Sequence, residues 1–184
     1  MIITRTPFRV TLGGGGTDLS SYYSNHGGFI FSFTLDKYMY ISLKKAFADD
    51  FIRVKYSKSE TVSSLDELDH EIAQACLRKV GFSKGIEVTS MADIPSGSGL
   101  GSSSTYTVGL LSALHNLKRD FISVQDLAEE ACEIEIDILQ KPMGKQDPYL
   151  AAFGGLLVME ISKDGTVKVS NANVSLSTLE NLKH

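Results

Sequence analysis

A short stretch of glycine and serine, PSGSGLGSSS at residues 95–104, forces the chain into a tight loop between two strongly patterned segments. The segment before it, around Ile86 and Val88, is typical of a strand, and leucines recur at helical spacing over residues 110–117 after it. Glycines let a backbone approach a phosphate closely. The start of a helix offers unpaired N–H groups and a positive dipole end, while serines add hydroxyl donors and a ligand for Mg²⁺. The pattern therefore predicts a phosphate-binding loop.

Other interpretations of this loop fit less well. A flexible glycine-serine linker is disfavoured, because the loop is short, carries Leu100 in its middle and lies between two patterned elements. A Walker loop is excluded, since no GK[ST] follows. The glycine spacing is also not GxGxxG, which disfavours a dinucleotide-binding fold.

Composition excludes several functional classes. The chain is 42% hydrophobic and has a formal net charge of −4 without a lysine- or arginine-rich run, so a nucleic-acid surface is not expected. Cys76 and Cys132 lie far apart and lack metal-type spacing, which is typical of buried thiols in a reducing compartment. No apolar run is long enough to span a bilayer, and the first ten residues lack the apolar core of a signal peptide. We therefore expect a cytoplasmic protein without membrane association.

Strands and helices mix along the chain without a regular βαβ rhythm, which predicts an α+β fold with a mixed sheet and helices on one face. One domain is expected over residues 1–170, and the polar residues 171–184 are expected to begin a missing C-terminal domain or a tail. The predicted strands are 2–12, two strands within 28–46, 51–57, one around Ile86 and Val88, and a hairpin of 155–161 and 166–170; the predicted helices are a short one capped by Thr17 or Asp18 and ending near Asn25, 66–80 ended by Gly81, one after residue 104, and 124–139 opened by a Ser123–Asp126 capping box.

Three segments in order resemble the GHMP kinases, the family of galactokinase, homoserine kinase and mevalonate kinase. These are TPFRVTLGGGGTD at residues 6–18, the loop at 95–104 and GKQDPYLAAFGG at 144–155. The resemblance implies the ribosomal-protein-like β-α fold of the family's N-terminal domain, ATP and Mg²⁺ as cofactors, and transfer of a phosphoryl group to an alcohol. The GGGGTD and GKQD segments are most similar to the branch that phosphorylates the anomeric hydroxyl of D-glycero-D-manno-heptose 7-phosphate.

The resemblance also assigns residues to the two substrates. The nucleotide-binding residues that it implies are Pro95, Gly97, Ser98, Gly99, Leu100, Gly101, Ser102, Ser103 and Ser104. The sugar-binding residues that it implies are Gly14, Gly15, Gly16, Thr17, Asp18 and Lys145. From the residues alone, Asp18 is equally compatible with an ordinary helix cap after a glycine turn. Lys145 is expected to pair with Asp147, to bind a substrate phosphate or simply to be solvated.

Asp147 is the candidate catalytic base, because a carboxylate beside the acceptor hydroxyl can take its proton and orient it for in-line attack. Spacing alone favours another interpretation, since Asp147 followed by Pro148 is a good cap for a short helix through Ala152. Arg9 matches the family's basic residue and would stabilise charge on the transferred phosphoryl group. In the first strand, Arg5, Arg9 and Thr11 alternate with Phe8, Val10 and Leu12 and are expected on the polar face. The alternative for Arg9 is a surface arginine, which is the preferred interpretation for Arg5.

Glu133 and Glu135 are separated by helical geometry. The residues three and four positions from Glu135 are mostly apolar, whereas those around Glu133 are mostly polar or charged. A carboxylate on an apolar face is costly unless a cation pairs with it. By resemblance Glu135 is the metal carboxylate and Ser103 the hydroxyl ligand of Mg²⁺, and the alternative for Glu135 is a buried ion pair.

Members of the family run well past the length of this chain, and nothing after Gly155 resembles their second half. We therefore expect a fragment of a kinase. The alternatives are a kinase for another sugar such as galactose or fucose, and a nucleotide-binding module that needs a partner chain to supply the missing half. A homo-oligomer is a further alternative for its partners.

Overall fold

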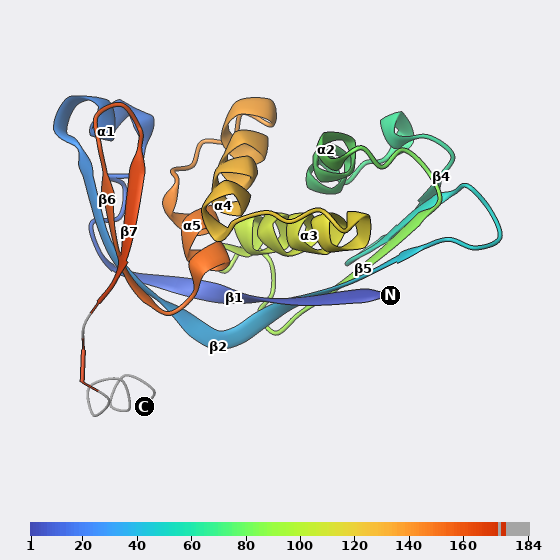
Figure 1. Ribbon diagram of the computed structural model, residues 1–184, viewed down its shortest axis with the longest axis horizontal. Helices are drawn as coiled ribbons and strands as arrows, with labels where there is room; N and C mark the ends of the chain where they lie inside the picture. Colours follow the sequence, from blue (N-terminus) through green and yellow to red (C-terminus); the bar gives the residue numbers. More distant parts are fainter. Residues whose placement is uncertain (173, 176–184) are drawn as a thin grey trace.

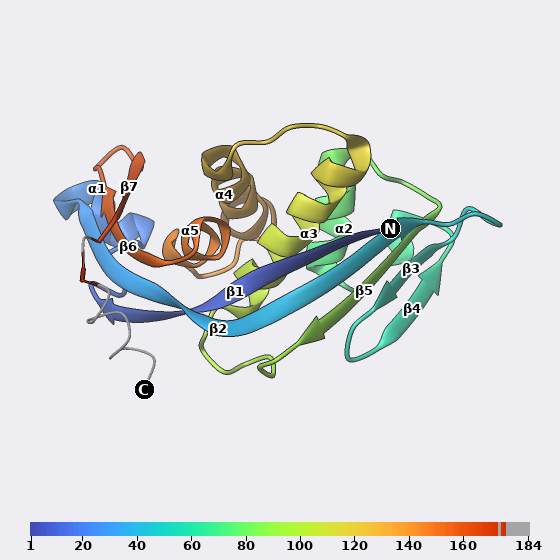
Figure 2. The same cartoon turned by 60° about the horizontal axis from the view of Figure 1, so that its bottom comes forward.

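Two long antiparallel strands form the middle of the sheet (Figure 1). The computed structural model of the protein describes residues 1–172, 174 and 175. These two strands belong to a mixed sheet with helices on one face, as the sequence predicts (Figure 2). The strands are β1 (Ile2–Gly13), β2 (Gly28–Lys45), β3 (Ile52–Lys55), β4 (Ser59–Val62), β5 (Ile86–Ala92), β6 (Leu156–Ile161) and β7 (Val167–Asn171); the helices are α1 (Ser20–His26), α2 (Glu71–Val80), α3 (Ser102–Lys118), α4 (Val124–Cys132) and α5 (Gln146–Phe153), with a 3₁₀ turn η1 (Leu65–Glu67) and a π-helix η2 (Glu133–Ile138).

Strand β2 is one strand of 18 residues, so the prediction of two strands within residues 28–46 is wrong. After Gly28, no glycine or proline interrupts the segment, and the strand bends without a turn (Figure 1). Strand β1 pairs along one edge of β2, while β6 and β5 pair with the two ends of the opposite edge. The two expected strands are therefore two halves of one strand with different neighbours.

The rest of the sheet extends outward from β2. Its order among the described residues is β4-β3-β5-β2-β6-β7, with β1 paired to β2 outside this path. The β3–β5 pair is parallel and the other pairs are antiparallel. The predicted strand at 51–57 and the hairpin at 155–170 are confirmed, whereas the sequence did not predict β4.

Strand β1 does not alternate regularly. A register shift between Pro7 and Arg9 leaves Phe8 opposite three residues of β2, 35–37, so the extra residues lie in β2. Phe8 is fully buried in the core, and Arg9, the next residue, contacts Asp147 of α5. In a regular strand two adjacent residues point to opposite faces, so the change of register after Phe8 accompanies a turn of Arg9 toward the helices. The predicted alternation is wrong at Leu12, which is 50% exposed.

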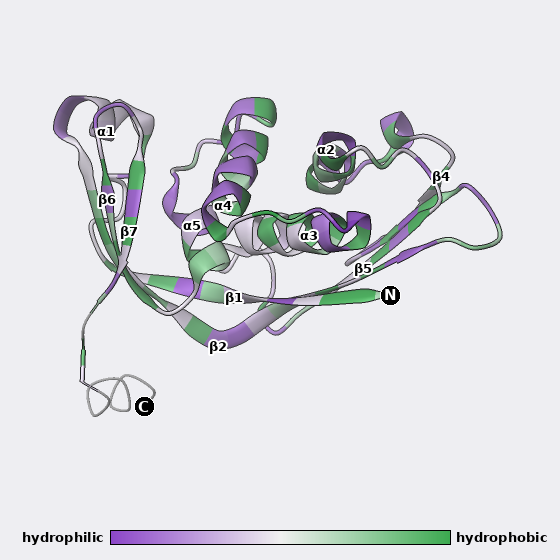
Figure 3. Ribbon diagram, in the orientation of Figure 1, coloured by the Kyte–Doolittle hydropathy of each residue, from purple (hydrophilic) through white to green (hydrophobic). Residues whose placement is uncertain are grey.

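Helix α3 lies across β1 and β2 at the centre of the core (Figure 2). Leu110, Leu111 and Leu114 have no exposed surface, which confirms the face that their spacing predicts. Each buried leucine contributes roughly 2 kcal/mol of transfer free energy. Gly109 lets the helix approach β1, because a Cβ there would lie 2.8 Å from Thr6 Oγ1. Figure 3 shows hydrophobic residues on the strands and on the helices that cover them.

Two predicted helices have different internal structure from that expected. The predicted helix 66–80 is split, since α2 begins at Glu71 with the His70 ring accepting a hydrogen bond from Ala73 N. Its predicted end at Gly81 is confirmed, with φ of 88°. The predicted helix 124–139 begins at the expected Ser123 cap, but η2 replaces the α-helix in its second half. The sequence pattern located both segments and missed the changes in winding.

The predicted tail, residues 171–184, begins where β7 ends at Asn171. Residues 173 and 176–184 of it lie outside the described residues. Within the part of the chain that the structure describes, no helix combines the length and apolar character that a membrane span requires. The cytoplasmic location expected from the sequence stays a prediction.

Candidate active site

The glycine-serine loop lies between β5 and α3, as predicted, and leaves the start of α3 open. Gly101 is the N-cap, no side chain caps the helix, and its first turn carries no acidic residue. Gly97, Gly99 and Gly101 have φ of 80°, 75° and 81°, a backbone region that other residues rarely adopt. The first N–H groups of an α-helix have no partner within the helix, so this end offers donors and a positive dipole to an anion.

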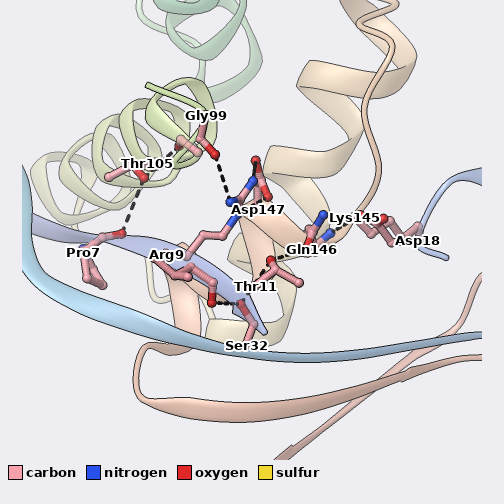
Figure 4. A network of polar contacts seen from close by, with 12 residues as sticks. Pro7, Arg9, Thr11, Asp18, Ser32, Gly99, Thr105, Lys145, Gln146 and Asp147 are labelled. Atoms are coloured by element: carbon pink, nitrogen blue, oxygen red, sulfur yellow. Dashed lines mark hydrogen bonds and ion pairs between the residues drawn. The ribbon is translucent and has the colours of Figure 1, made fainter. Parts of the chain in front are cut away.

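Arg9 and Asp147 form a two-pronged ion pair beside this loop (Figure 4). Arg9 Nε donates to Asp147 Oδ1 at 2.6 Å and Nη2 donates to Oδ2 at 2.9 Å. The third guanidinium nitrogen, Nη1, donates to the Gly99 carbonyl at 3.1 Å. The two side chains are 15% and 18% exposed, so both remain accessible to a ligand. The structure therefore joins all three predicted segments at one point, and the interpretation of Arg9 as a free surface arginine is wrong.

Helix α5 holds Asp147 inside its first turn. The N-cap is Lys145, so the interpretation of Asp147 as the cap is wrong. Pro148 follows within the same turn, where a missing N–H costs no intrahelical hydrogen bond. The Asp147 carboxylate is thus free to face Arg9 and the loop.

Ser103 and Glu135 meet behind the loop. Ser103 Oγ donates to Glu135 Oε2 at 2.5 Å. Glu135 has no exposed surface, and its other oxygen, Oε1, has no hydrogen-bond partner in the described structure. Glu133 instead pairs with Lys79 at 2.6 Å on the solvated side, which confirms the predicted assignment of the two faces.

This pair fits the Mg²⁺ that the family implies. A buried carboxylate with an unpartnered oxygen beside a serine hydroxyl is a donor set for a hard cation, and Mg²⁺ commonly takes few protein ligands together with phosphate oxygens. No group of three or more histidine, cysteine or acidic side chains that could hold a metal occurs among the described residues. A cation here would therefore need oxygens from a nucleotide as well.

Lys141 is a residue of this site that sequence reasoning missed. Its Nζ donates to Ser103 Oγ at 2.8 Å and lies 3.8 Å from Glu135 Oε2. It comes back to the site because Gln140, with φ of 52°, reverses the chain after η2. No sequence pattern signals a left-handed glutamine, so this contact could not be predicted.

A cavity of about 670 Å³ opens beside the loop. Its walls include Pro95, Gly97, Ser103 and Lys141 as well as the aromatic rings of Tyr56, His70 and Tyr106. The His70 ring stacks on Tyr106 with 4.7 Å between centroids and meets Tyr56 edge-on at 4.6 Å. Burial lowers the pKa of His70, and its Nδ1 accepts a hydrogen bond from Ala73 N. A cavity of this size, lined by both aromatic rings and phosphate donors, suits a nucleotide.

Asp18 is buried rather than a helix cap. It is 2% exposed and accepts a hydrogen bond from Gln146 N at 2.9 Å, while Leu19 is the N-cap of α1. The predicted cap at Thr17 is wrong too, since its hydroxyl bonds the carbonyls of Gly14 and Phe29. The Asp18 carboxylate thus fixes the start of α5 from the opposite end of the chain.

The ionisation of Asp18 should show in the pH dependence of stability. Burial raises the pKa of the Asp18 carboxyl, and the negative charge of Asp147 raises it further. Hydrogen bonds from backbone N–H groups, such as that of Gln146, lower this pKa but do not outweigh burial. The folded state then binds more protons than the unfolded state, so this group's contribution to stability decreases as pH rises from its unfolded to its folded pKa. We expect Asp18→Asn to remove that decrease. Unfolding free energies measured from pH 3.5 to 7 would contradict this if the difference between wild type and variant were constant.

Lys145 points away from the ion pair. Its Nζ donates to the Gly165 carbonyl at 2.8 Å and lies 3.4 Å from Glu129 Oε2. The expected pair with Asp147 is therefore wrong, and with 18% exposure the residue is not a solvated lysine either. Lys145 borders a second cavity, of about 590 Å³, whose walls carry the carboxylates of Asp126, Glu129, Glu130, Glu133 and Asp137. An acidic wall repels phosphate, which argues against Lys145 as its ligand.

Gln146 and Thr11 also reach the site without having been predicted. Thr11 Oγ1 donates to Gln146 Oε1 at 2.7 Å and lies 3.3 Å from Ser32 Oγ (Figure 4). Thr11 reaches α5 because it lies two residues after Arg9, on the same side of β1. Its neighbour Gln146 precedes the candidate base directly. The only available signal was their position within segments that already carried other candidates.

Comparisons with known proteins find a family model and relatives that are similar to this chain. Residues 68–155 match the model of the GHMP kinases N-terminal domain, a range that contains the loop, Glu135 and Asp147. The D-glycero-alpha-D-manno-heptose 7-phosphate kinase of Campylobacter jejuni is 31% identical over 182 residues, which cover 92% of this chain and 53% of that kinase. The L-fucokinase/L-fucose-1-P guanylyltransferase of Bacteroides fragilis is 27% identical over 192 residues, covering 85% of this chain and 20% of that protein.

A solved structure agrees over nearly the whole chain. The crystal structure of a D-glycero-D-manno-heptose 1-phosphate kinase from Bacteroides thetaiotaomicron has a TM-score of 0.91 and 28% identity, covering 99% of this chain and 63% of that one. The present chain thus spans 53% of the curated C. jejuni relative. The fold, the three ordered segments and the match over residues 68–155 agree in one similarity, to the N-terminal domain of the GHMP kinases.

Proposed function

We propose that this chain is the ATP-binding part of a sugar kinase that phosphorylates the anomeric hydroxyl of a heptose 7-phosphate. The observation that carries the proposal is the Arg9–Asp147 pair, which touches the Gly99 carbonyl of the glycine-serine loop. An acid–base group and a cation thus lie beside the loop that would hold the phosphates. This is the arrangement that in-line phosphoryl transfer requires.

ATP would occupy the cavity beside the loop. Its phosphates would meet the open start of α3, and its base would lie toward the aromatic wall of Tyr56 and His70. Ser103 and Glu135 would hold Mg²⁺, which neutralises phosphate charge when bound. The protein's own contribution is to position the triphosphate and to exclude water around it.

At the acceptor, Asp147 would take the proton of the attacking hydroxyl. Each carboxylate oxygen that accepts from Arg9 keeps a second lone pair, so the ion pair does not prevent this role. Arg9 fixes the carboxylate and would stabilise negative charge on the phosphoryl group during transfer. No covalent enzyme intermediate is needed.

The acceptor is inferred from the relatives. One relative is named as a heptose 7-phosphate kinase and another as a heptose 1-phosphate kinase. In the proposal, position 7 carries the phosphate already on the sugar, and position 1, the anomeric position, receives the new one. Gly14 to Thr17 would contact the sugar, and the buried carboxylate of Asp18 would hold the start of α5 beside it. The similarity to an L-fucokinase makes fucose the second candidate acceptor. Steady-state assays of a full-length form with each sugar test the proposal, and preference for fucose would overturn the heptose assignment.

The length missing relative to the C. jejuni kinase would supply the rest of the sugar site. We propose that the chain by itself binds nucleotide and transfers phosphate poorly. A turnover of about 1–100 s⁻¹, the usual range for kinases, measured on this chain alone would contradict that.

Ser103→Ala is expected to weaken binding of Mg·ATP about tenfold, because it removes a ligand of the cation and a donor near the phosphates. Isothermal titration of both proteins with Mg·ATP measures this. Ser63→Ala is the matched control, because it removes a serine that donates to a carboxylate, Glu67 Oε1 at 3.1 Å, outside the loop cavity. Its smaller effect would assign the loss to the cation site. A wild-type chain that binds no Mg·ATP would contradict the proposed function as a whole.

A further inference from the structure

Lys141 supplies the only ion pair that Glu135 makes within the part of the chain that the structure describes. The carboxylate is fully buried, and the ammonium nitrogen lies 3.8 Å from its Oε2 and 2.8 Å from Ser103 Oγ. A buried charge without a partner costs several kcal/mol in general. Lys141 therefore contacts Ser103 and Glu135, the two side chains that would bind the metal cation in the proposed function.

The backbone holds Lys141 in place. Lys141 N donates to the Glu135 carbonyl at 2.9 Å, and Met143 N donates to the Lys141 carbonyl at 2.8 Å. The reversal at Gln140 is stabilised by a side-chain hydrogen bond to the Asp137 carbonyl at 2.6 Å. A non-glycine residue with positive φ persists only where its surroundings require it. The position of Lys141 is therefore set by the fold, while its long side chain keeps rotational freedom.

The same ammonium group faces the proposed nucleotide cavity. Lys141 lines the cavity together with Gly97, Ser102 and Ser103 of the loop, and its side chain is 26% exposed. An ammonium has three donors, of which one is used by Ser103 Oγ. It can therefore turn from Glu135 toward an anion in the cavity without moving the backbone.

We propose that Lys141 is a phosphate ligand of the nucleotide and competes with the metal cation for Glu135. This rests on the proposed function. In the empty site the ammonium neutralises the buried carboxylate. When a divalent cation binds Glu135 and Ser103, the ammonium is released to the nucleotide phosphates. Lys141 thereby couples the binding of the two ligands. When the metal binds without nucleotide, it displaces the ammonium from Glu135 and leaves that ammonium without an anionic partner, which lowers the affinity for the metal.

The consequence is a pair of effects with opposite sign. In Lys141→Met, Mn²⁺ without nucleotide should bind about tenfold more tightly, since no ammonium competes for the carboxylate. ATP in EDTA should bind about tenfold more weakly, since a charge-assisted contact is lost and Glu135 repels the phosphates. A purely structural lysine would not strengthen metal binding on removal.

The experiment measures both affinities by isothermal titration of this chain. Lys79→Met is the matched control, because it removes a lysine charge from a pair with Glu133 at 2.6 Å, outside the loop cavity. Neither affinity should change in the control. Metal affinity that is unchanged or weaker in Lys141→Met, or ATP affinity that is unchanged, would overturn the proposal. A wild-type chain that binds neither ligand would instead contradict the proposed function.

Removing Lys141 leaves the buried charge of Glu135 without a cation, which can prevent Lys141→Met from folding. A second comparison covers that case. Glu135→Gln with Lys141→Met removes both charges. ATP in EDTA should bind this double variant about tenfold more weakly than Glu135→Gln alone, since only the contact from Lys141 differs. Equal affinities would show that the lysine does not meet the nucleotide.

Discussion

Asp147→Asn is expected to lower the rate of phosphoryl transfer about 10²- to 10⁴-fold, the usual contribution of a general base, and to leave ATP affinity within about twofold. Asparagine keeps the size of the side chain and one oxygen acceptor for Arg9, but it cannot take a proton. The contacts proposed for the nucleotide come from the loop and from the start of α3, which do not include the Asp147 side chain. A loss of rate without a loss of binding would therefore identify the proton acceptor.

The measurement compares single-turnover rates of a full-length form with ATP titrations of the same protein. Asp66→Asn is the matched control, because Asp66 also accepts from an arginine, Arg78, at 2.6 Å but is 83% exposed and does not line the loop cavity. Transfer by Asp147→Asn at the rate of the control would remove Asp147 from the base role. Loss of ATP binding together with transfer would show that the residue supports the loop instead.

Gly14→Ala is expected to destabilise the fold by at least about 3 kcal/mol, which corresponds to roughly 6–12 °C in melting temperature for a chain of this size. A Cβ on Gly14 would overlap the carbonyl group of Phe29 in β2, and the residue has φ of 81°. Both the clash and the left-handed backbone oppose any side chain. Because the overlap involves backbone, no rotamer change can relieve it.

The two neighbouring glycines provide graded controls. Gly16 also has a positive φ, of 86°, but a Cβ there meets nothing within 4 Å, so Gly16→Ala should cost only about 1–2 kcal/mol. Gly15 has ordinary backbone and one contact at 3.8 Å, so Gly15→Ala should stay within about 0.5 kcal/mol. Thermal unfolding of the three variants checks this order, and equal melting temperatures would show that the segment is not packed against β2.

Local patterns determined much of the fold. Helical spacing separated buried Glu135 from exposed Glu133, and turn chemistry located the helix end at Gly81 and the helix start at Ser123. The loop at residues 95–104 was recognised because glycine conformations and helix starts are properties of a few adjacent residues. The α+β class followed from the order of such segments. These features are encoded within short windows and need no knowledge of distant neighbours.

Tertiary pairing decided the rest. β2 became one strand because three strands from other parts of the chain pair with it, and a register shift between β1 and β2 accompanies the turn of Arg9 toward Asp147. Lys145 bonds the turn between β6 and β7 instead of the ion pair, and Lys141 reaches Glu135 after a reversal at Gln140. Such contacts join residues far apart in sequence or depend on one unusual backbone angle. The free energy of each such contact depends on how the whole core packs, so the residues around one side chain do not predict which partner it meets.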